Sequence, residues 1–591
     1  MISLKQHLST IFSDAFEAYG LDRKYGEVVI SNRPDLGQFQ CNGALAAAKA
    51  TANGHKQNPR AIAQGVIDRL RDQNNFGQVL LAGPGFINIS LSDEFLAAYV
   101  QGIAHDERLG CAPVAQPRQV VIDFGGPNVA KPMHVGHLRP SIIGDSLQRL
   151  YRFMGDQVMS DIHLGDWGVQ MGMLICELAR RRPDLPYFDP AYTGPYPVEP
   201  PVAILDLQEM YPTASARCKQ NEQELAAALQ ATVELQQGRP GYRALWRHFV
   251  DVSVKDLKED FDSLGITFDL WLGESDYHDQ LPTLLEQLQQ SGQAHFSEGA
   301  LVVPLDEGDG QPELPPLILV KSDGGYLYST TDLATLLQRV NDFQADLILY
   351  VVDARQGIYF KQLFQAARRL DLAQGIQLEH VAFGTVNGPD GKPFKSRAGG
   401  VMRLKELIAM VIEAALNRMA ESGIARDVGE SERLLVARQV GIAALKYADL
   451  MNHRTSDYIF DPEKFTKFEG RTGPYLLYTA VRIKSILRKA GERAITPGPI
   501  LPPMDQDRDL MLLLTQLPEA VQAAYLNYAP NHLCDFAYNL AQGFNNFYNR
   551  CHILHEDDPA RQGSWLALAQ LSLAELELVL SLLGIEIPER M

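Results

Sequence analysis

Two histidines with a glycine between them are the residues of this sequence whose types and spacing most directly suggest chemistry. They lie in the segment KPMHVGH, which begins at Lys131 and contains His134, Gly136 and His137. Imidazoles three residues apart can both donate hydrogen bonds to one anion, and the glycine lets that anion approach the backbone. Lys131 adds a nearby positive charge. The pattern predicts a site that contacts the phosphates of a nucleotide.

The residues around this motif predict a strand, a loop and a helix. Val120, Val121 and Ile122 form a short apolar run, and residues 138–154 carry apolar side chains at spacings of three and four. A helix that begins just after a strand and loop points free backbone N–H groups at one spot, which suits a phosphate. The motif alone leaves two alternatives open. The histidines could be a metal pair, although no glutamate or cysteine completes such a site, or they could be ordinary partly buried residues.

The composition is that of a folded protein from a reducing compartment. The 591 residues are 46% hydrophobic and 21% charged, with a net charge of −18. The six cysteines are scattered without a CxxC pair, which argues against a zinc site or a disulfide framework. No secretory leader and no run of about 18 apolar residues is seen, so we expect a cytoplasmic protein that does not enter a membrane. Because an acidic chain repels nucleic acid, an RNA partner would have to meet local basic patches.

The order of helical and β-rich segments predicts an α/β fold with three domains. Residues 1–112 predict a small α+β domain. Residues 113–425 predict a Rossmann-like parallel-sheet domain, because strand–turn–helix units follow one another. In its second unit Asp166 is expected to cap a helix, and a later strand is expected at residues 318–320. A proline-dense stretch predicts an insertion at about residues 182–245. Residues 426–591 predict an all-α helical bundle.

Polar residues near the predicted strand ends form a second candidate site. Asp123 and Asn128 follow the first strand of the α/β domain, and Gln356 follows a later apolar run. Tyr328 and Asp332 are four residues apart and share one face of a predicted helix. Ligands of open parallel sheets bind beyond the carboxyl ends of the strands, so these groups should converge around a small polar cation. Each residue taken alone could instead serve as a cap or a turn residue.

A glycine-rich loop at residues 391–400 is the second basic feature. It carries Lys392, Lys395 and Arg397 within six residues, and Ser396 lies beside the last two. Glycines at both ends predict a mobile loop, and its cations predict a clamp for phosphate. The alternative is a solvated surface hairpin.

Two further patterns suggest contact with RNA. Phe86 and Asn88 share one face of an alternating strand, where a ring can stack on a base and an amide can bind its edge. Later in the chain, a local excess of basic residues surrounds Tyr475, Tyr478 and Arg482, which fall on one helical face. The alternatives are a core phenylalanine beside a turn asparagine, and a charged helix face over core tyrosines.

The segments around these residues resemble one enzyme family. HVGH resembles the HIGH signature of class I aminoacyl-tRNA synthetases, and the loop at 391–400 occupies the place of their KMSKS signature. The strings GGPNVAKPMHVGHLRPSIIGDSL, HLGDWGVQMG, KSDGGYLYSTTDLATL, FEGRTGPYLLYTAVR and LLGIEIPERM together resemble arginyl-tRNA synthetases over nearly the whole chain.

This resemblance implies an activity and a set of partners. It implies activation of L-arginine by ATP to arginyl-adenylate, followed by transfer of the arginyl group to the 3′ end of tRNA(Arg). Mg²⁺ would be carried with ATP, and activation would wait for bound tRNA. The resemblance also implies a monomer, an N-terminal domain that binds the tRNA elbow and a helical domain that binds the anticodon.

The same resemblance implies a role for each candidate residue. His134 and His137 match the HIGH histidines, which stabilise charge on the α-phosphate during adenylate formation. The matched arginine-binding positions are Asp123, Asn128, His137, Tyr328, Asp332 and Gln356. Asp123 stands where the family often has Glu. The matched ATP-binding positions are His134, Gly136, His137, Lys395 and Ser396. The matched tRNA-binding positions are Phe86, Asn88, Tyr475, Tyr478 and Arg482.

The second signature departs from the family pattern. Pro393 and Phe394 stand where Lys and Met are expected. Lys131 fills the position of a lysine that is thought to compensate in such members, with Lys395 and Arg397 as helpers, so all three join the histidines as implied catalytic residues. Two other functions remain open: a nucleotidylyltransferase that works without tRNA, and a non-catalytic RNA-binding or regulatory relative.

Overall fold

The chain divides into two compact units. The computed structural model describes residues 3–33, 35–50, 58–305, 314–322, 325–392, 394, 401–426 and 428–591. The first unit comprises residues 1–113, 418–443 and 467–591, and the second comprises residues 114–417 and 444–466. The division falls inside two long helices, α13 (Leu404–Ser422) and α14 (Glu430–Leu450). The units group the chain differently from the three expected domains, whose boundaries stay a prediction.

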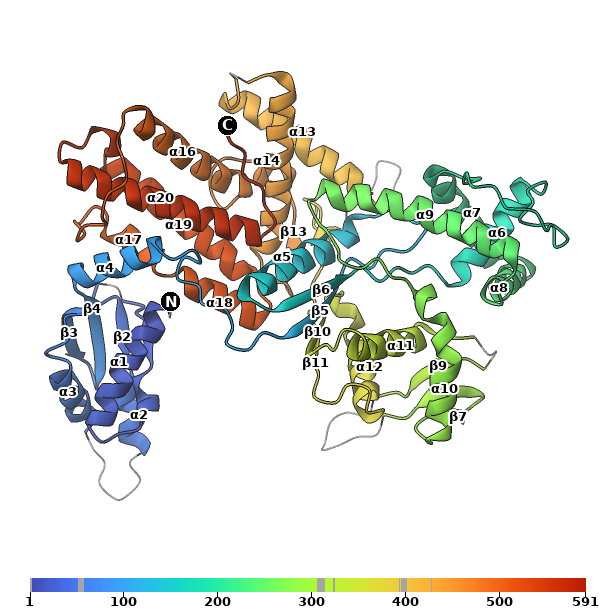
Figure 1. Ribbon diagram of the computed structural model, residues 1–591, viewed down its shortest axis with the longest axis horizontal. Helices are drawn as coiled ribbons and strands as arrows, with labels where there is room; N and C mark the ends of the chain where they lie inside the picture. Colours follow the sequence, from blue (N-terminus) through green and yellow to red (C-terminus); the bar gives the residue numbers. More distant parts are fainter. Residues whose placement is uncertain are drawn as a thin grey trace. The chain divides into compact units, whose positions relative to one another are not determined.

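The first unit begins with a four-stranded antiparallel sheet in the order β1-β2-β4-β3 (Figure 1). Its strands are β1 (Val28–Ile30), β2 (Phe39–Cys41), β3 (Phe76–Ala82) and β4 (Phe86–Leu91). Its helices are α1 (Leu4–Ala18), α2 (Gly43–Ala50), α3 (Pro59–Arg69) and α4 (Asp93–Ala104), with a 3₁₀ turn η1 (Arg23–Gly26). Leu8, Phe12, Val28 and Ile89 are fully buried in it. This arrangement confirms the small α+β fold.

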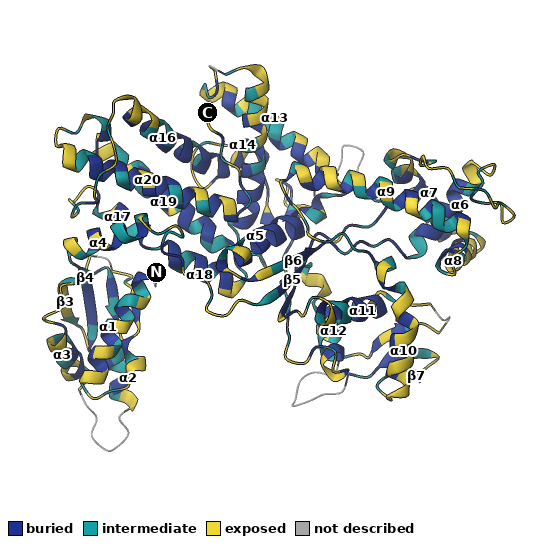
Figure 2. Ribbon diagram, viewed as in Figure 1, coloured by how far each residue is buried: buried dark blue, intermediate teal, exposed yellow. Residues whose placement is uncertain are grey.

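The rest of the first unit is helical, as the sequence predicts. Its helices are α16 (Gly473–Glu492), α17 (Arg508–Leu514), α18 (Leu517–Asn527), α19 (Asn531–Arg550), η5 (Ile553–His555) and α20 (Pro559–Leu582). Helix α20 packs against α16 and α19 and is dark along most of its length in Figure 2. Within the described part of the chain, α20 is the one helix long and apolar enough to cross a membrane, and 61% of its most apolar stretch is buried inside the protein. A helix that is apolar on all sides belongs in a core.

One carboxyl group of α20 lies in this core. Glu575 has no exposed surface, and neither of its carboxyl oxygens has a hydrogen-bond partner. Burial raises the pKa of Glu575 well above its usual value, so the folded state holds it as the neutral acid. The unfolded chain releases that proton near pH 4, so Glu575 increasingly favours unfolding as the pH rises above that value.

We therefore expect Glu575→Leu to stabilise the protein. Replacing an unpartnered buried polar group by an apolar one should raise the free energy of unfolding by about 1–3 kcal/mol. The gain should be larger at pH 8.5 than at pH 5, because only the wild-type side chain titrates on unfolding. Thermal unfolding followed by circular dichroism at both pH values measures this. A variant less stable than wild type at both values would show that Glu575 has a stabilising role.

The second unit is built on a four-stranded parallel sheet in the order β11-β10-β5-β6. Its strands are β5 (Gln119–Asp123), β6 (Gln157–Asp161), β10 (Leu347–Tyr350) and β11 (Gln377–His380). Helix α5 (Leu138–Met154) connects β5 to β6, and α12 (Gly357–Arg369) connects β10 to β11. The strand order reverses between β5 and β10, which is where ligands bind in Rossmann-like sheets. The predicted Rossmann-like fold is confirmed.

The second unit contains further helices, 3₁₀ turns and strands. Its other helices are α6 (Val169–Arg181), α7 (Ile204–Gln220), α8 (Glu222–Gln236), α9 (Pro240–Ser263), α10 (Leu281–Gln290), α11 (Tyr328–Asn341) and α15 (Pro462–Phe465). The 3₁₀ turns are η2 (Val135–His137), η3 (Glu274–Gln280) and η4 (Ala354–Gln356). The other strands are β7 (His295–Ser297), β8 (Ala300–Val303), β9 (Leu317–Val320), β12 (Val386–Asn387) and β13 (Tyr458–Ile459).

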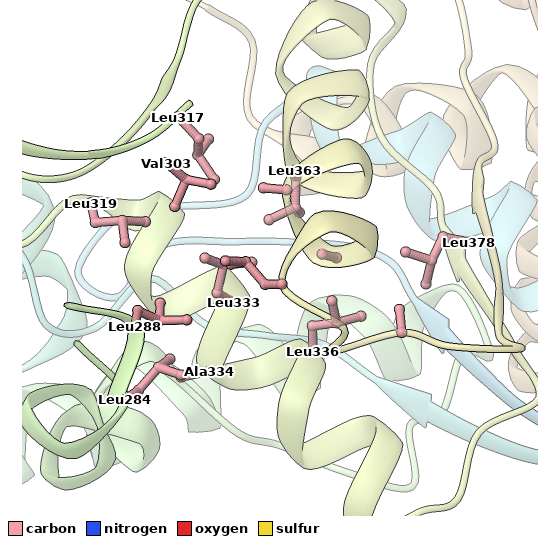
Figure 3. Packing of buried hydrophobic residues seen from close by; sticks show 14 of the residues in the cluster. Leu284, Leu288, Val303, Leu317, Leu319, Leu333, Ala334, Leu336, Leu363 and Leu378 are labelled. Atoms are coloured by element: carbon pink, nitrogen blue, oxygen red, sulfur yellow. The ribbon is translucent and has the colours of Figure 1, made fainter. Parts of the chain in front are cut away.

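The strand expected at residues 318–320 exists, but it lies in a separate sheet. Strand β9 pairs with β8 in an antiparallel sheet of three strands. Leucines of α10, α11, α12 and β9 converge in one buried cluster, in which Leu333 and Leu336 of α11 face Leu363 of α12 (Figure 3). This cluster fixes α11 and α12 against each other, and these two helices carry the polar residues of the candidate site.

Candidate active site

A cavity of about 480 Å³ opens at the carboxyl ends of β5, β10 and β11. Its volume is in the range of small-molecule sites, about 300–1,000 Å³. Five of the predicted site residues line it: Asp123, His134, Gly136, His137 and Gln356. The predicted residues Asn128, Lys131, Tyr328 and Asp332 are not among its lining residues.

The histidine motif forms a tight turn that holds both imidazoles through their Nδ1 atoms. The backbone N–H of Gly136 donates to Nδ1 of His134 at 3.0 Å, and the N–H of His134 donates to Nδ1 of His137 at 3.1 Å. The two ring centroids are 4.1 Å apart. A side chain at Gly136 would place its Cβ 2.7 Å from the His134 ring, so this turn needs a glycine. Because Nδ1 accepts in both rings, a neutral imidazole must carry its proton on Nε2.

Both histidines are held neutral. Burial lowers the pKa of His137 to about 3, and electrostatic repulsion by His134, were it protonated, and by Lys131 lowers it further. Burial also lowers the pKa of His134, again with a contribution from Lys131. At neutral pH the motif therefore offers two N–H donors to an anion in the cavity and does not offer two cations.

The basic residues predicted to assist the motif are only partly described. The Lys131 ammonium lies 4.7 Å from the centre of the Tyr211 ring on α7. Pro393, Lys395, Ser396 and Arg397 lie outside the described residues. The segment after the loop is attached to the histidine turn, because Val135 N–H donates to the Met402 carbonyl at 3.1 Å.

Asp123 already has a partner inside the protein. Its Oδ2 accepts from Nη2 of Arg339 at 2.7 Å, and the same nitrogen donates to Oδ2 of Asp161 at 2.7 Å. Asp123 and Asp161 are paired residues at the ends of β5 and β6, and Arg339 is 1% exposed. The arginine therefore forms an ion pair with both carboxylates and joins the two strand ends. Its Nε and Nη1 atoms are buried without a hydrogen-bond partner.

Tyr328 and Asp332 lie one turn apart on α11, as the sequence predicts. Asp332 Oδ2 accepts a hydrogen bond from the hydroxyl of Tyr359 on α12. Burial raises the pKa of Asp332, whereas nearby His163 and the Tyr359 hydroxyl oppose the rise. Tyr328 is 58% exposed and its ring meets the Tyr359 ring edge to face, with centroids 4.9 Å apart. The negative charge of Asp123 also raises the pKa of Asp332.

The structure adds two polar residues that the sequence does not single out. Glu274 begins η3, and His163 follows β6 with a left-handed backbone (φ 44°) and a buried Nδ1 that has no partner. Burial raises the pKa of Glu274 to about 7, nearby His163 lowers it, and Asp166 and Asp332 raise it further. The charges of Asp166 and Asp332 thus act on Glu274. The short motif HLGDWG could have pointed to His163, whereas no motif in the sequence pointed to Glu274, which lies more than 100 residues later.

The helix-capping role predicted for Asp166 is wrong. The residue before α6 is Gly168, which supplies no side-chain cap. Asp166 instead accepts from the backbone N–H and the hydroxyl of Ser275, at 3.0 and 2.6 Å. This long-range contact ties the β6–α6 loop to η3, and burial raises the pKa of Asp166 to about 6.

Asn128 and Gln356 occupy loops at the same edge of the sheet. Asn128 pairs with Gly165 in an isolated bridge, and a Cβ at Gly165 would lie 2.3 Å from the Asn128 side-chain oxygen. Glycine at 165 thus lets the Asn128 amide lie against the backbone. Gln356 is the exposed residue immediately before α12, and it lines the cavity.

The residues predicted to contact RNA form two sets in the first unit, one on β4 and one on α16. Members of each set form hydrogen bonds with another residue of that unit. Asn88 on β4 is buried, and its side-chain oxygen accepts from Nε2 of Gln40 on β2 at 2.8 Å, while Phe86 is partly exposed on the same strand. Gln40 thus fixes the orientation of the Asn88 amide. The sequence did not reveal this pair, because 48 residues separate the two amides.

On α16, one asparagine of α19 joins two of the three predicted contact residues. Asn545 accepts from Arg482 at 2.7 Å and donates to the Tyr475 hydroxyl at 3.0 Å. Arg482 also donates to the Tyr478 hydroxyl at 3.1 Å. All three predicted residues are partly exposed, so the helix presents them as one polar and aromatic face.

Comparisons with known proteins cover the whole chain. The family model "tRNA synthetases class I (R), catalytic domain" matches residues 100–462. "Arginyl tRNA synthetase N terminal domain" matches residues 3–91, and "DALR anticodon binding domain" matches residues 476–591.

Relatives and solved structures agree with these matches. Proteins named arginine–tRNA ligase from Maricaulis maris and Alkaliphilus oremlandii are 52% and 47% identical to the chain, each covering 100% of both sequences. Arginyl-tRNA synthetase structures from Plasmodium falciparum and Thermus thermophilus share the fold, with TM-scores of 0.82 and 0.79 at 24% and 23% identity over 100% of each chain. A catalytic-domain match over more than half of the sequence, together with relatives of this identity and coverage, shows that the chain belongs to the arginyl-tRNA synthetase family.

Proposed function

We propose that this protein is an arginine–tRNA ligase that activates L-arginine with ATP and transfers the arginyl group to the 3′ end of tRNA(Arg). The observation that carries the proposal is the pair of neutral imidazoles held as Nε2–H donors beside a cavity at the reversal of strand order. Full-length relatives named arginine–tRNA ligase support it.

The first step joins arginine to AMP. The arginine carboxylate attacks the α-phosphorus of ATP, a P–O bond forms, and the bond to the β-phosphate breaks as pyrophosphate leaves with its electrons. Little proton transfer is needed, so positioning and charge stabilisation supply the rate. His134 and His137 would donate to the phosphate oxygens that gain charge, and Gly136, which has no side chain, would let the phosphate approach the backbone. Lys131, Lys395, Ser396 and Arg397 would hold the pyrophosphate, and Mg²⁺ would enter bound to ATP.

The carboxyl groups of Asp332 and Glu274 would receive the substrate side chain. A guanidinium group is a planar fork of donors that stays charged, and carboxylates bind it in two places at once. We assign Asp332, Glu274 and Tyr328 to the guanidinium, and Asn128, His137 and Gln356 to the amino-acid end. Asp123 would influence the bound arginine through its charge and without direct contact, because one of its oxygens is bonded to Arg339.

In the second step the terminal ribose hydroxyl of tRNA attacks the adenylate carbonyl, and AMP leaves. The proposed contacts with tRNA are Phe86 and Asn88 in the N-terminal sheet and Tyr475, Tyr478 and Arg482 on α16. We expect the protein to work as a monomer in the cytoplasm, without a membrane partner.

Isotope exchange between pyrophosphate and ATP tests the proposal. Exchange should require L-arginine and should rise sharply when tRNA(Arg) is added. A nucleotidylyltransferase that acts without tRNA would exchange equally well in its absence, and a binding-only relative would not exchange at all. Exchange driven by a different amino acid would contradict the assigned substrate.

A further inference from the structure

Tyr359 connects the residues proposed to bind arginine, although no motif singled it out. It lies in the first turn of α12, three residues after Gln356, and it is partly buried. Its hydroxyl donates to Asp332 Oδ2, and its ring packs against Tyr328. The other side of the ring meets Phe360 at 5.5 Å and joins the core under α11 and α12.

Resting on the proposed function, we propose that Tyr359 is a positioning residue for arginine recognition: its hydroxyl orients the Asp332 carboxylate that receives the substrate guanidinium. A carboxylate offers about four lone-pair positions, and one phenol proton occupies one of them. The remaining positions can accept the two parallel N–H groups of a guanidinium. Without the phenol, the carboxylate would be free to turn away from the fork geometry.

The phenol is suited to this task because it keeps its proton. Burial and the negative charge of Asp332 raise the pKa of Tyr359 well above its usual value, so the hydroxyl is a donor throughout the working pH range. Its donated hydrogen bond also favours the ionised form of Asp332 and so opposes the effect of burial.

Other charged and titratable groups face Asp332 from every element packed around it. They are His163 after β6, Asp123 on β5, Glu274 on η3, Arg339 on α11 and Tyr350 on β10. None of them changes in a Tyr359→Phe variant. A shift in the titration of arginine binding in that variant therefore reports the loss of the phenol donor alone.

The sign of the expected pH effect follows from this loss. Arginine binding requires ionised Asp332, so affinity falls as the pH drops through the pKa of that group. Removing the donor leaves burial unopposed and raises the pKa of Asp332. The pH below which arginine affinity falls, called here the acid limb, should therefore be higher in Tyr359→Phe than in the wild type.

The test measures tRNA charging by the full-length Tyr359→Phe enzyme between pH 6 and 8.5. We expect the KM for arginine at pH 7 to rise about 10- to 100-fold, the usual effect of losing a hydrogen bond to a charged group, with the KM for ATP and kcat unchanged. The acid limb should shift upward. Tyr187→Phe is the matched control, because it removes another buried phenol, bonded to His248 in the same unit, and should leave all of these values unchanged.

A double variant shows whether Tyr359 acts through Asp332. In an Asp332→Asn background, equilibrium binding of arginine should be no weaker after Tyr359→Phe is added. The inference is overturned if the arginine KM does not change, if the KM for ATP rises by the same factor, if the acid limb stays in place, or if the double variant loses further affinity. Failure of the wild-type enzyme to charge tRNA with arginine would instead reject the proposed function.

Discussion

His137→Ala is expected to lower the rate of arginyl-adenylate formation by about 10²–10³, the usual cost of losing one preorganised donor to a developing anion. The neutral ring presents Nε2–H to the cavity because its Nδ1 accepts the His134 N–H. Binding of ATP should change little, because the donor is aimed at charge that develops on the phosphate in the transition state. Pyrophosphate exchange at saturating arginine, ATP and tRNA measures this rate.

A variant of a second buried histidine, His248, is the control that distinguishes a role of His137 in the reaction from a role in folding. His248 is buried and bonded to the Tyr187 hydroxyl at 3.0 Å in the same unit. His248→Ala should lower the melting temperature and leave the exchange rate near that of wild type. If His137→Ala lost stability in proportion to activity, or if its rate stayed within a factor of about two, the assigned role would be rejected.

Asp332→Ala is expected to weaken arginine binding by about 2–5 kcal/mol, because it removes one partner of a desolvated charge pair. The cavity of about 480 Å³, which we propose binds ATP, does not include Asp332 among its lining residues, so the KM for ATP should stay within a factor of about two. Steady-state charging kinetics with each substrate varied in turn measure the two constants.

The matched control for this variant lies on the last turn of the same helix. Asp342 is the exposed C-cap residue that follows α11, and Asp342→Asn should change neither constant. Equal loss of arginine and ATP affinity in Asp332→Ala would mean that the residue supports the whole site, which would contradict a specific role in binding the guanidinium.

The sequence alone determined the parts of this protein that depend on local spacing. The histidine turn closes within four residues, so the order of His134, Gly136 and His137 was enough to predict a compact anion-binding motif. Tyr328 and Asp332 were expected on one helical face because a helix repeats every 3.6 residues. The periodicity of whole segments likewise predicted the parallel sheet and the helical bundle.

Tertiary structure decided how the polar groups are shared between the site and the core. Arg339 lies 216 residues from Asp123 and takes one of its oxygens, so a residue expected to bind substrate also holds two strands together. Asp166 was expected to cap a helix, but it accepts hydrogen bonds from Ser275, which lies 109 residues away in the sequence. Tyr359 reaches Asp332 only because the leucine core packs α12 against α11. The physical reason is the same in each case: local spacing sets which way a side chain points, whereas long-range packing of the core sets which group it meets.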